Sequence, residues 1–138
     1  MMEDKIQQVI VVRADLKMRK GKIAAQSSHS SMAIFFKLME RYVDPVTHKT
    51  APNTFCLTMT DDMVAWKEGS FTKICVYVNS EDELMDVYGQ AEAANLPCAL
   101  ITDNGLTEFH GVKTRTCIAI GPARKSDLDP ITGHLPLY

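Results

Sequence analysis

Four short apolar runs, rich in valine, isoleucine and cysteine, constrain the fold more than any other feature of this sequence. They cover residues 8–13, 72–78, 98–102 and 115–120. The first run is continuous, as expected for a strand that is buried on both faces of a sheet. Because segments with helical periodicity separate the runs, we expect a single three-layer α/β/α domain over residues 1–138, in which helices cover both faces of a four-stranded mixed sheet.

The longest helical pattern follows the first strand. From residue 22 to about residue 42, small and apolar side chains recur every three or four positions, which predicts a helix that packs broadly on the sheet. The predicted contact stripe consists of Ala24, Ser28, Ser31, Phe35, Leu38 and Tyr42, widened by Ala25, Met32, Phe36 and Met39.

The next part of the chain is less uniform. Residues 44–70 are expected to form an irregular extended segment that contains a short helix at about residues 62–67. Ser80 and Glu83 then match a capping box, so a helix should begin there and run to about Asn95.

Positions 13 to 22 carry five basic residues and one acidic residue, although the whole chain has a net charge of −2. Such a local cluster suits a single contact with a polyanion. The alternative is a solvated loop whose lysines only aid solubility, and charge alone leaves both interpretations open. The basic residues are Arg13, Lys17, Arg19, Lys20 and Lys22.

The sequence disfavours membrane, disulfide-linked and metal-dependent classes. No apolar run approaches the roughly 18–20 residues of a spanning helix, and no signal or transit pattern is present, so we expect a cytoplasmic protein without a membrane segment. The four cysteines form no C-x-x-C pair, which favours buried thiols. Since His, Cys and carboxylates show no ligand spacing, we expect a reaction that needs no metal and no cofactor.

Three blocks of sequence carry a resemblance to a known family. The stretch V-V-R-A-D-L-K-M-R-K-G-K-I-A-A-Q-S-S-H at residues 11–29 resembles the opening of type 2 peptidyl-tRNA hydrolases, with its D-L-K-M-G-K-G-K and A-A-Q-x-x-H-A. I-T-D-N-G-L-T-E at residues 101–108 resembles the family's D-A-G-x-T-Q. T-C-I-A-I-G-P and the final T-G-H-L-P-L-Y resemble its T-x-x-x-I-G-P and T-G-H-L-K-L-Y.

The resemblance implies a homodimeric hydrolase that cleaves the ester bond between a peptide and tRNA. Lys22, Asp103, Thr107 and Thr116 match family positions associated with activity. Our hypothesis is that Asp103 holds Lys22 and the attacking water, while Lys22 stabilises the oxyanion or the leaving ribose oxygen. Thr107 and Thr116 would position water or substrate through their hydroxyl groups.

Other residues are candidates for binding the substrate. Lys17, Arg19 and Lys20 could hold tRNA phosphates without reading sequence. Gln26 and His29 follow Lys22 by one and two helical turns and could line the same site. For His29 the alternative is a hydrogen-bonded packing residue. Without the resemblance, Asp103 would be a turn aspartate in D-N-G and Thr116 a plain strand residue.

The chain also departs from the family pattern. Arg19 replaces a glycine, Glu108 replaces a glutamine, an extra residue lies at about residues 110–113, and residues 44–70 look longer than usual. Pro130 should shorten or kink the last helix. These departures leave open two alternatives: an RNA-binding protein of the same fold that is catalytically weak, or an interaction module that uses residues 44–70.

Overall fold

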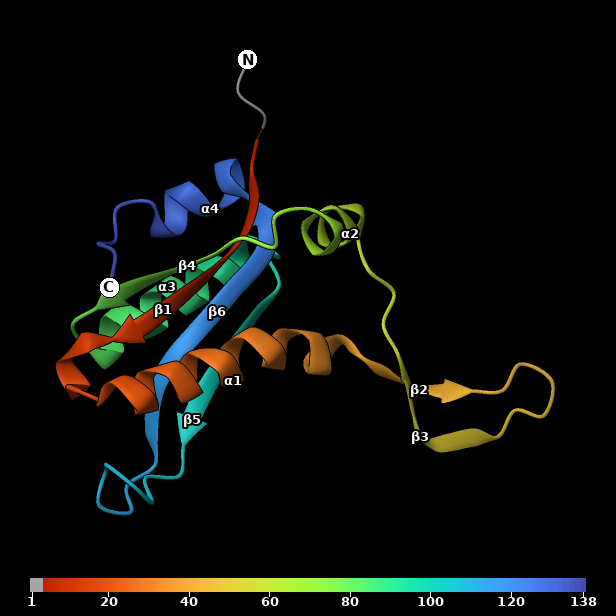
Figure 1. Cartoon of the computed structure of the whole chain (residues 1–138), viewed down its shortest axis with the longest axis horizontal. Coiled ribbons are helices and arrows are strands. Elements are labelled where there is room, and N and C mark those ends of the chain that lie inside the picture. Colours follow the sequence, from red (N-terminus) through yellow and green to blue (C-terminus); the bar gives the residue numbers. More distant parts are fainter. Residues whose placement is uncertain (1–3) are drawn as a thin grey trace.

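The structure, a computed structural model, describes residues 4–138 (Figure 1). The main sheet has the strand order β4–β1–β6–β5. β1 and β4 run parallel, and β6 runs antiparallel to both of its neighbours, β1 and β5. The predicted four-stranded mixed sheet is therefore confirmed. Its strands are β1 (Ile6–Arg13), β4 (Lys73–Val78), β5 (Cys98–Asp103) and β6 (Thr114–Arg124).

Helices cover both faces of this sheet, as predicted. α1 (Lys20–Leu38) packs on one face, where Ile34 enters a core cluster with alternate side chains of β1 and β6. α3 (Glu81–Ala93) and α4 (Lys125–Thr132) pack on the other face, where the remaining side chains of β1 and β6 form the second cluster. Figure 1 shows α1 and α3 on opposite sides of the sheet.

The predicted contact stripe of α1 is wrong. Ala24, Ser28 and Leu38 are exposed, and the buried side chains are Gln26, Ser30 and Ile34. The buried polar groups are tolerated because they are hydrogen-bonded: the Ser30 hydroxyl donates to the Ser27 carbonyl oxygen at 2.9 Å, and the Gln26 amide bonds within the site described below. A pattern of apolar residues cannot identify buried positions that are occupied by polar side chains.

The predicted end of α1 at residue 42 is also wrong. The backbone becomes extended at Met39, where α1 has ended. β2 (Glu40–Val43) then pairs with β3 (Thr50–Cys56) in an antiparallel hairpin. Part of the segment expected to be irregular is therefore a hairpin, which extends away from the main sheet (Figure 1). Nearly all of its side chains are exposed, so no alternation of apolar and polar residues marks its strands.

The predicted starts of the later helices are confirmed. α2 (Asp61–Glu68) contains the short helix that was expected near residue 62. At the start of α3, the Glu83 N–H donates to the Ser80 hydroxyl at 3.0 Å, as the capping box predicts. α4 contains Pro130 within its eight residues. Within residues 4–138, none of the helices has the length and apolar character required to cross a lipid bilayer.

Candidate active site

The candidate site lies at the edge of the sheet where β1 and β5 end and β6 begins. Asp103 is the last residue of β5 and pairs with Thr114, the first residue of β6. Lys22 lies in the first turn of α1, which starts shortly after β1 ends. Two segments separated by 81 positions therefore meet at one point, as the sequence predicted from the ends of the strands.

Lys22 is held by two acceptors from the segment that follows β5. Its Nζ donates to Asp103 Oδ1 at 2.8 Å and to Thr107 Oγ1 at 2.9 Å. Both members of the ion pair are largely buried, with 14% of the Lys22 side chain and 13% of the Asp103 side chain exposed. An ammonium group has three N–H donors, so these two bonds leave one of them without an acceptor among residues 4–138.

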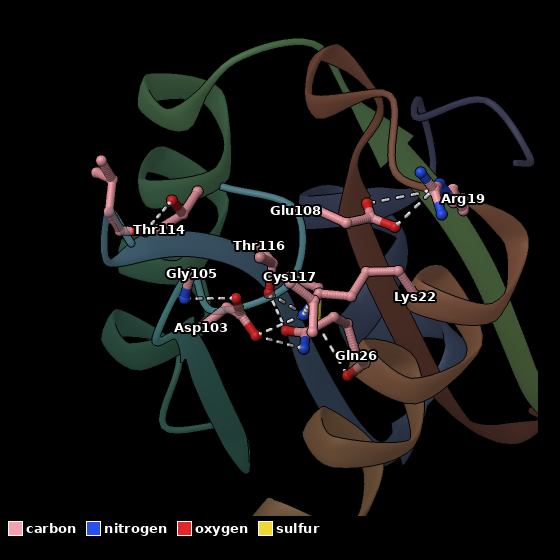
Figure 2. A network of polar contacts seen from close by, with 11 residues as sticks. Arg19, Lys22, Gln26, Asp103, Gly105, Glu108, Thr114, Thr116 and Cys117 are labelled. Carbon is pink, nitrogen blue, oxygen red and sulfur yellow. Dashed lines mark hydrogen bonds and ion pairs between the residues drawn. The ribbon is translucent and has the colours of Figure 1, made fainter. Parts of the chain in front are cut away.

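Asp103 is hydrogen-bonded through both carboxylate oxygens. Besides the bond from Lys22, Oδ1 accepts a bond from Gln26 Nε2 at 3.1 Å, and Oδ2 accepts a bond from the Gly105 N–H at 2.8 Å (Figure 2). The hydrogen bond from Lys22 is the largest cause that lowers the pKa of Asp103 below its ordinary value of 3.8, and partial burial opposes it. Asp103 is therefore a weak base at neutral pH, suited to orienting other groups.

This lowered pKa predicts how the site responds to acid. The stabilisation that the Asp103 carboxylate provides is fully present above its ordinary pKa of 3.8 and is lost as the pH falls through the lower pKa of the folded state. We expect a carbon NMR titration of the Asp103 carboxyl group to give a midpoint below 3.8 and no change between pH 7 and pH 5. A midpoint above 3.8 would contradict the ion pair with Lys22.

Thr116 lies beneath this ion pair. Its side chain is fully buried, and its hydroxyl donates to Gln26 Oε1 at 2.5 Å. Because Gln26 Nε2 in turn donates to Asp103, a chain of hydrogen bonds runs from Thr116 through Gln26 to the carboxylate (Figure 2). Thr116 is thus placed to act through Gln26, in contrast to the direct contact with water or substrate that we expected from the sequence.

A β-bulge explains the direction of Thr116. The register between β5 and β6 shifts so that Cys117 pairs with Ile101 while Arg115 pairs with Thr102, which leaves Thr116 without a partner of its own on β5. Strict alternation would point Thr116 away from α1, because the next residue, Cys117, faces α1. Bulges near active sites commonly re-aim a side chain in this way.

The remaining predicted residues lie outside the cluster of hydrogen bonds. Lys17, Arg19 and Lys20 are exposed, as phosphate contacts require. Arg13 instead binds Asp15 at 2.7 Å and the Arg115 carbonyl oxygen at 3.0 Å. His29 is exposed, which does not fit the alternative of a hydrogen-bonded packing residue.

The loop after β5 contributes two groups, from Gly105 and Phe109, that were not among the predicted site residues. The Gly105 N–H, which bonds Asp103, lies two positions after the aspartate, and D-N-G is a pattern of turns in which an aspartate bonds its own backbone. Gly105 has a φ of 81°, and a Cβ there would lie 2.2 Å from the Val112 carbonyl oxygen, so a larger residue would displace the loop. Phe109 also faces Lys22, with its ring centre 5.7 Å from Nζ.

Comparisons with known proteins give one consistent answer. The family described as "Peptidyl-tRNA hydrolase PTH2" matches residues 6–138. The peptidyl-tRNA hydrolase of Methanocaldococcus jannaschii is 36% identical over 129 residues, which cover 94% of this chain and 96% of that protein. That of Saccharolobus solfataricus is 38% identical over 132 residues, covering 96% and 98% of the two chains.

Two other comparisons add to this result. The probable peptidyl-tRNA hydrolase 2 of Drosophila melanogaster is 36% identical over 136 residues, which cover 99% of this chain but 63% of that longer protein. Among solved structures, a protein of unknown function from Agrobacterium tumefaciens matches with a TM-score of 0.56 over 99% of both chains. Its sequence identity is 10%, so this likeness concerns the fold alone.

Proposed function

Because the chain belongs to the PTH2 family of peptidyl-tRNA hydrolases, it is a peptidyl-tRNA hydrolase, and we propose that the cluster around Lys22 and Asp103 is its reaction centre. The observation that carries this proposal is the position of the Lys22 ammonium group, which is mostly shielded from water and has one donor unused. A charge in such surroundings acts more strongly on a nearby oxygen than it does in water.

The reaction adds water across the ester bond that joins the peptide to the terminal ribose of tRNA. The hydroxide part of the water joins the acyl carbon, and the remaining proton ends on the ribose oxygen. In the proposed mechanism the free N–H of Lys22 donates to the carbonyl oxygen as negative charge develops there. Asp103 keeps Lys22 in place, and its Oδ2, which accepts one bond from the Gly105 N–H, has a further lone pair that could orient the attacking water.

The other cluster residues support this pair. Thr107 accepts a bond from Lys22 Nζ. Together with Asp103 it fixes the direction of the remaining N–H of the Lys22 ammonium group. Gln26 and Thr116 form the buried chain that holds the Asp103 carboxylate in one orientation. In this scheme Gln26 and Thr116 are positioning residues, whereas Lys22 and Asp103 touch the reacting atoms.

We assign the tRNA phosphates to the exposed basic residues Lys17, Arg19 and Lys20. Lys17 and Arg19 precede α1 and Lys20 is its first residue, so a phosphate held there would lie close to Lys22. His29, exposed two turns further along α1, is a candidate contact for the same substrate. Contacts of this kind position the substrate but do not select a sequence.

This assignment predicts a strong dependence of binding on salt. We expect the KM of the parent protein to rise by more than tenfold between 50 and 200 mM salt, because each phosphate contact releases counterions. Lys17→Ala and Lys20→Ala should each raise KM and leave kcat nearly unchanged. Each should also reduce the slope of log KM against log salt concentration by about one, as expected for the loss of one phosphate contact. Unchanged KM at high salt would contradict the assignment.

One assay tests the proposed function as a whole. The protein is incubated with an N-blocked aminoacyl-tRNA in the presence of a chelator, and the release of free tRNA is followed with Lys22→Ala as the control. Release by the parent alone supports the proposal, including our expectation that no metal or cofactor is needed. Binding without release would favour the catalytically weak RNA-binding alternative.

The resemblance also supports two proposals, one about the oligomeric state of the enzyme and one about its location in the cell. We propose a homodimer, because two large side chains on α1, Met32 and Phe36, are 55% and 60% exposed and offer an apolar surface. Sedimentation as a 15.4 kDa monomer at all concentrations would contradict this. Since the substrate belongs to translation, we propose that the enzyme works in the cytoplasm.

A further inference from the structure

We propose that Glu108 is a positioning residue that fixes the first turn of α1, and with it Lys22, against the loop that carries Thr107. This inference rests on the proposed role of Lys22. It assigns a function to a position at which the sequence departs from the family pattern, and it concerns a residue outside the hydrogen-bonded cluster described above.

The start of α1 lacks the features that usually stabilise a helix N-terminus. Its N-cap residue, Arg19, has a side chain that caps no N–H, and the first turn contains no acidic residue. Instead, this turn carries Arg19, Lys20 and Lys22. Positive side chains are unfavourable at the positive end of a helix dipole, so this end requires a negative group from elsewhere in the fold.

Glu108 supplies that group from the loop between β5 and β6. Its Oε2 accepts a bond from the Arg19 N–H at 3.4 Å, and its Oε1 lies 3.9 Å from Arg19 Nε (Figure 2). The Glu108 side chain is 20% exposed, whereas that of Arg19 is 90% exposed. The carboxylate therefore rests against the helix end, while the guanidinium group stays accessible to a phosphate.

The neighbours of Glu108 show why this contact bears on the reaction. Thr107 accepts the bond from Lys22 Nζ, and the Phe109 ring lies 5.7 Å from the same nitrogen. Phe109 also packs against the core cluster beneath α1. Three consecutive loop residues thus contact a single helical turn. If Glu108 releases Arg19, the loop and the helix can move apart, and the bond that directs Lys22 weakens.

The two departures from the family pattern support the same inference. Arg19 and Glu108 lie 89 positions apart in the sequence, yet they contact each other in the structure. An added positive charge at the helix end is thus matched by an added negative charge on the facing loop. A glutamine at position 108 would keep an oxygen that can accept the Arg19 N–H, but it would lack this charge.

The first test compares two substitutions of Glu108 by their kinetics. Glu108→Ala should lower kcat about tenfold and change KM by less than about twofold, because a misplaced Lys22 affects the transition state more than substrate binding. Glu108→Gln keeps an acceptor for the Arg19 N–H but not the charge, so it should recover only part of this loss. As a matched control, Asp129→Ala removes an exposed carboxylate that binds Lys125 on α4 at 2.6 Å, and it should leave kcat unchanged.

The second readout does not depend on activity. The Ile23 N–H forms the first backbone bond of α1, to the Arg19 carbonyl oxygen at 2.9 Å. Glu108→Ala should increase the hydrogen-exchange rate of this amide several-fold, and Glu108→Gln should restore its protection only in part. Thermal unfolding is measured for each variant, and rates are compared at a temperature at which all of them are folded.

The outcomes separate this inference from the proposed reaction centre. If Lys22→Ala abolishes hydrolysis while Glu108→Ala leaves both kcat and the exchange of Ile23 unchanged, the role of Glu108 is wrong and the reaction centre stands. If Glu108→Ala raises KM alone, Glu108 contributes to binding and the inference is overturned. If Lys22→Ala retains full activity, the proposed centre itself fails.

Discussion

Replacing Lys22 with alanine is expected to lower kcat by about 10²–10³-fold, the usual effect of removing one preorganised donor from a developing oxyanion. The structural reason is that Lys22 brings a largely buried positive charge to the point where α1 and the end of β5 meet. KM should change much less, because the contacts with tRNA are assigned to the exposed basic residues. Single-turnover release of tRNA is the appropriate measurement.

Two further variants test whether the effect depends on the position of Lys22 and on the shape of its charged group. Lys37→Ala removes a lysine from the last turn of the same helix, where Nζ donates to the Cys98 carbonyl oxygen at 3.1 Å, and kcat should stay close to that of the parent. Lys22→Arg keeps the charge but presents a planar group that does not fit the two acceptors, so it should restore little activity. Full activity of Lys22→Arg would show that charge alone suffices.

The second large effect is expected for Asp103→Asn, which should lower kcat about 10²-fold. The substitution removes the charge that holds the Lys22 ammonium group. It also replaces one of the two carboxylate oxygens with an NH2 group, which would face either the Gly105 N–H or the donors from Lys22 and Gln26. Two donors that face each other cannot bond, so Lys22 should lose its fixed direction.

The measurement is again single-turnover release, combined with binding of uncleaved substrate. Affinity for tRNA should be retained, because the phosphate contacts are assigned to Lys17, Arg19 and Lys20 and a carboxylate makes none of them. Glu81→Gln offers a matched control. Glu81 on α3 forms an exposed ion pair with Arg115 on β6 at 3.2 Å, and the loss of this pair should leave the rate unchanged. If Asp103→Asn keeps nearly full activity while Lys22→Ala has none, the role given to the aspartate is wrong.

Much of the fold could be predicted because the buried strands are uniform in character. The continuous β-branched run of β1 and the capping box at Ser80 are local signals, and both identified their elements. The meeting of Lys22 and Asp103 was likewise predictable, because Asp103 ends one strand and Lys22 lies at the start of the helix that follows another. The resemblance to a family added the identity of the chemistry, which no pattern of apolar residues contains.

Other features could not be predicted because they depend on partners distant in sequence. The buried face of α1 includes Gln26 and Ser30, whose burial is favourable only after their hydrogen bonds have formed. Thr116 faces Gln26 only because a bulge interrupts the alternation of β6, and no single residue type marks that bulge. The contact between Arg19 and Glu108 joins two loops with no shared local signal.

The hairpin formed by β2 and β3 has no residue in either core cluster. Mutations there should therefore cost the domain little folding free energy, and insertions or deletions between residues 44 and 49 should be tolerated. Over evolutionary time this hairpin can diverge faster than the sheet beside the proposed reaction centre. In the laboratory it offers a place to graft a fluorescent label or an affinity peptide onto a working enzyme.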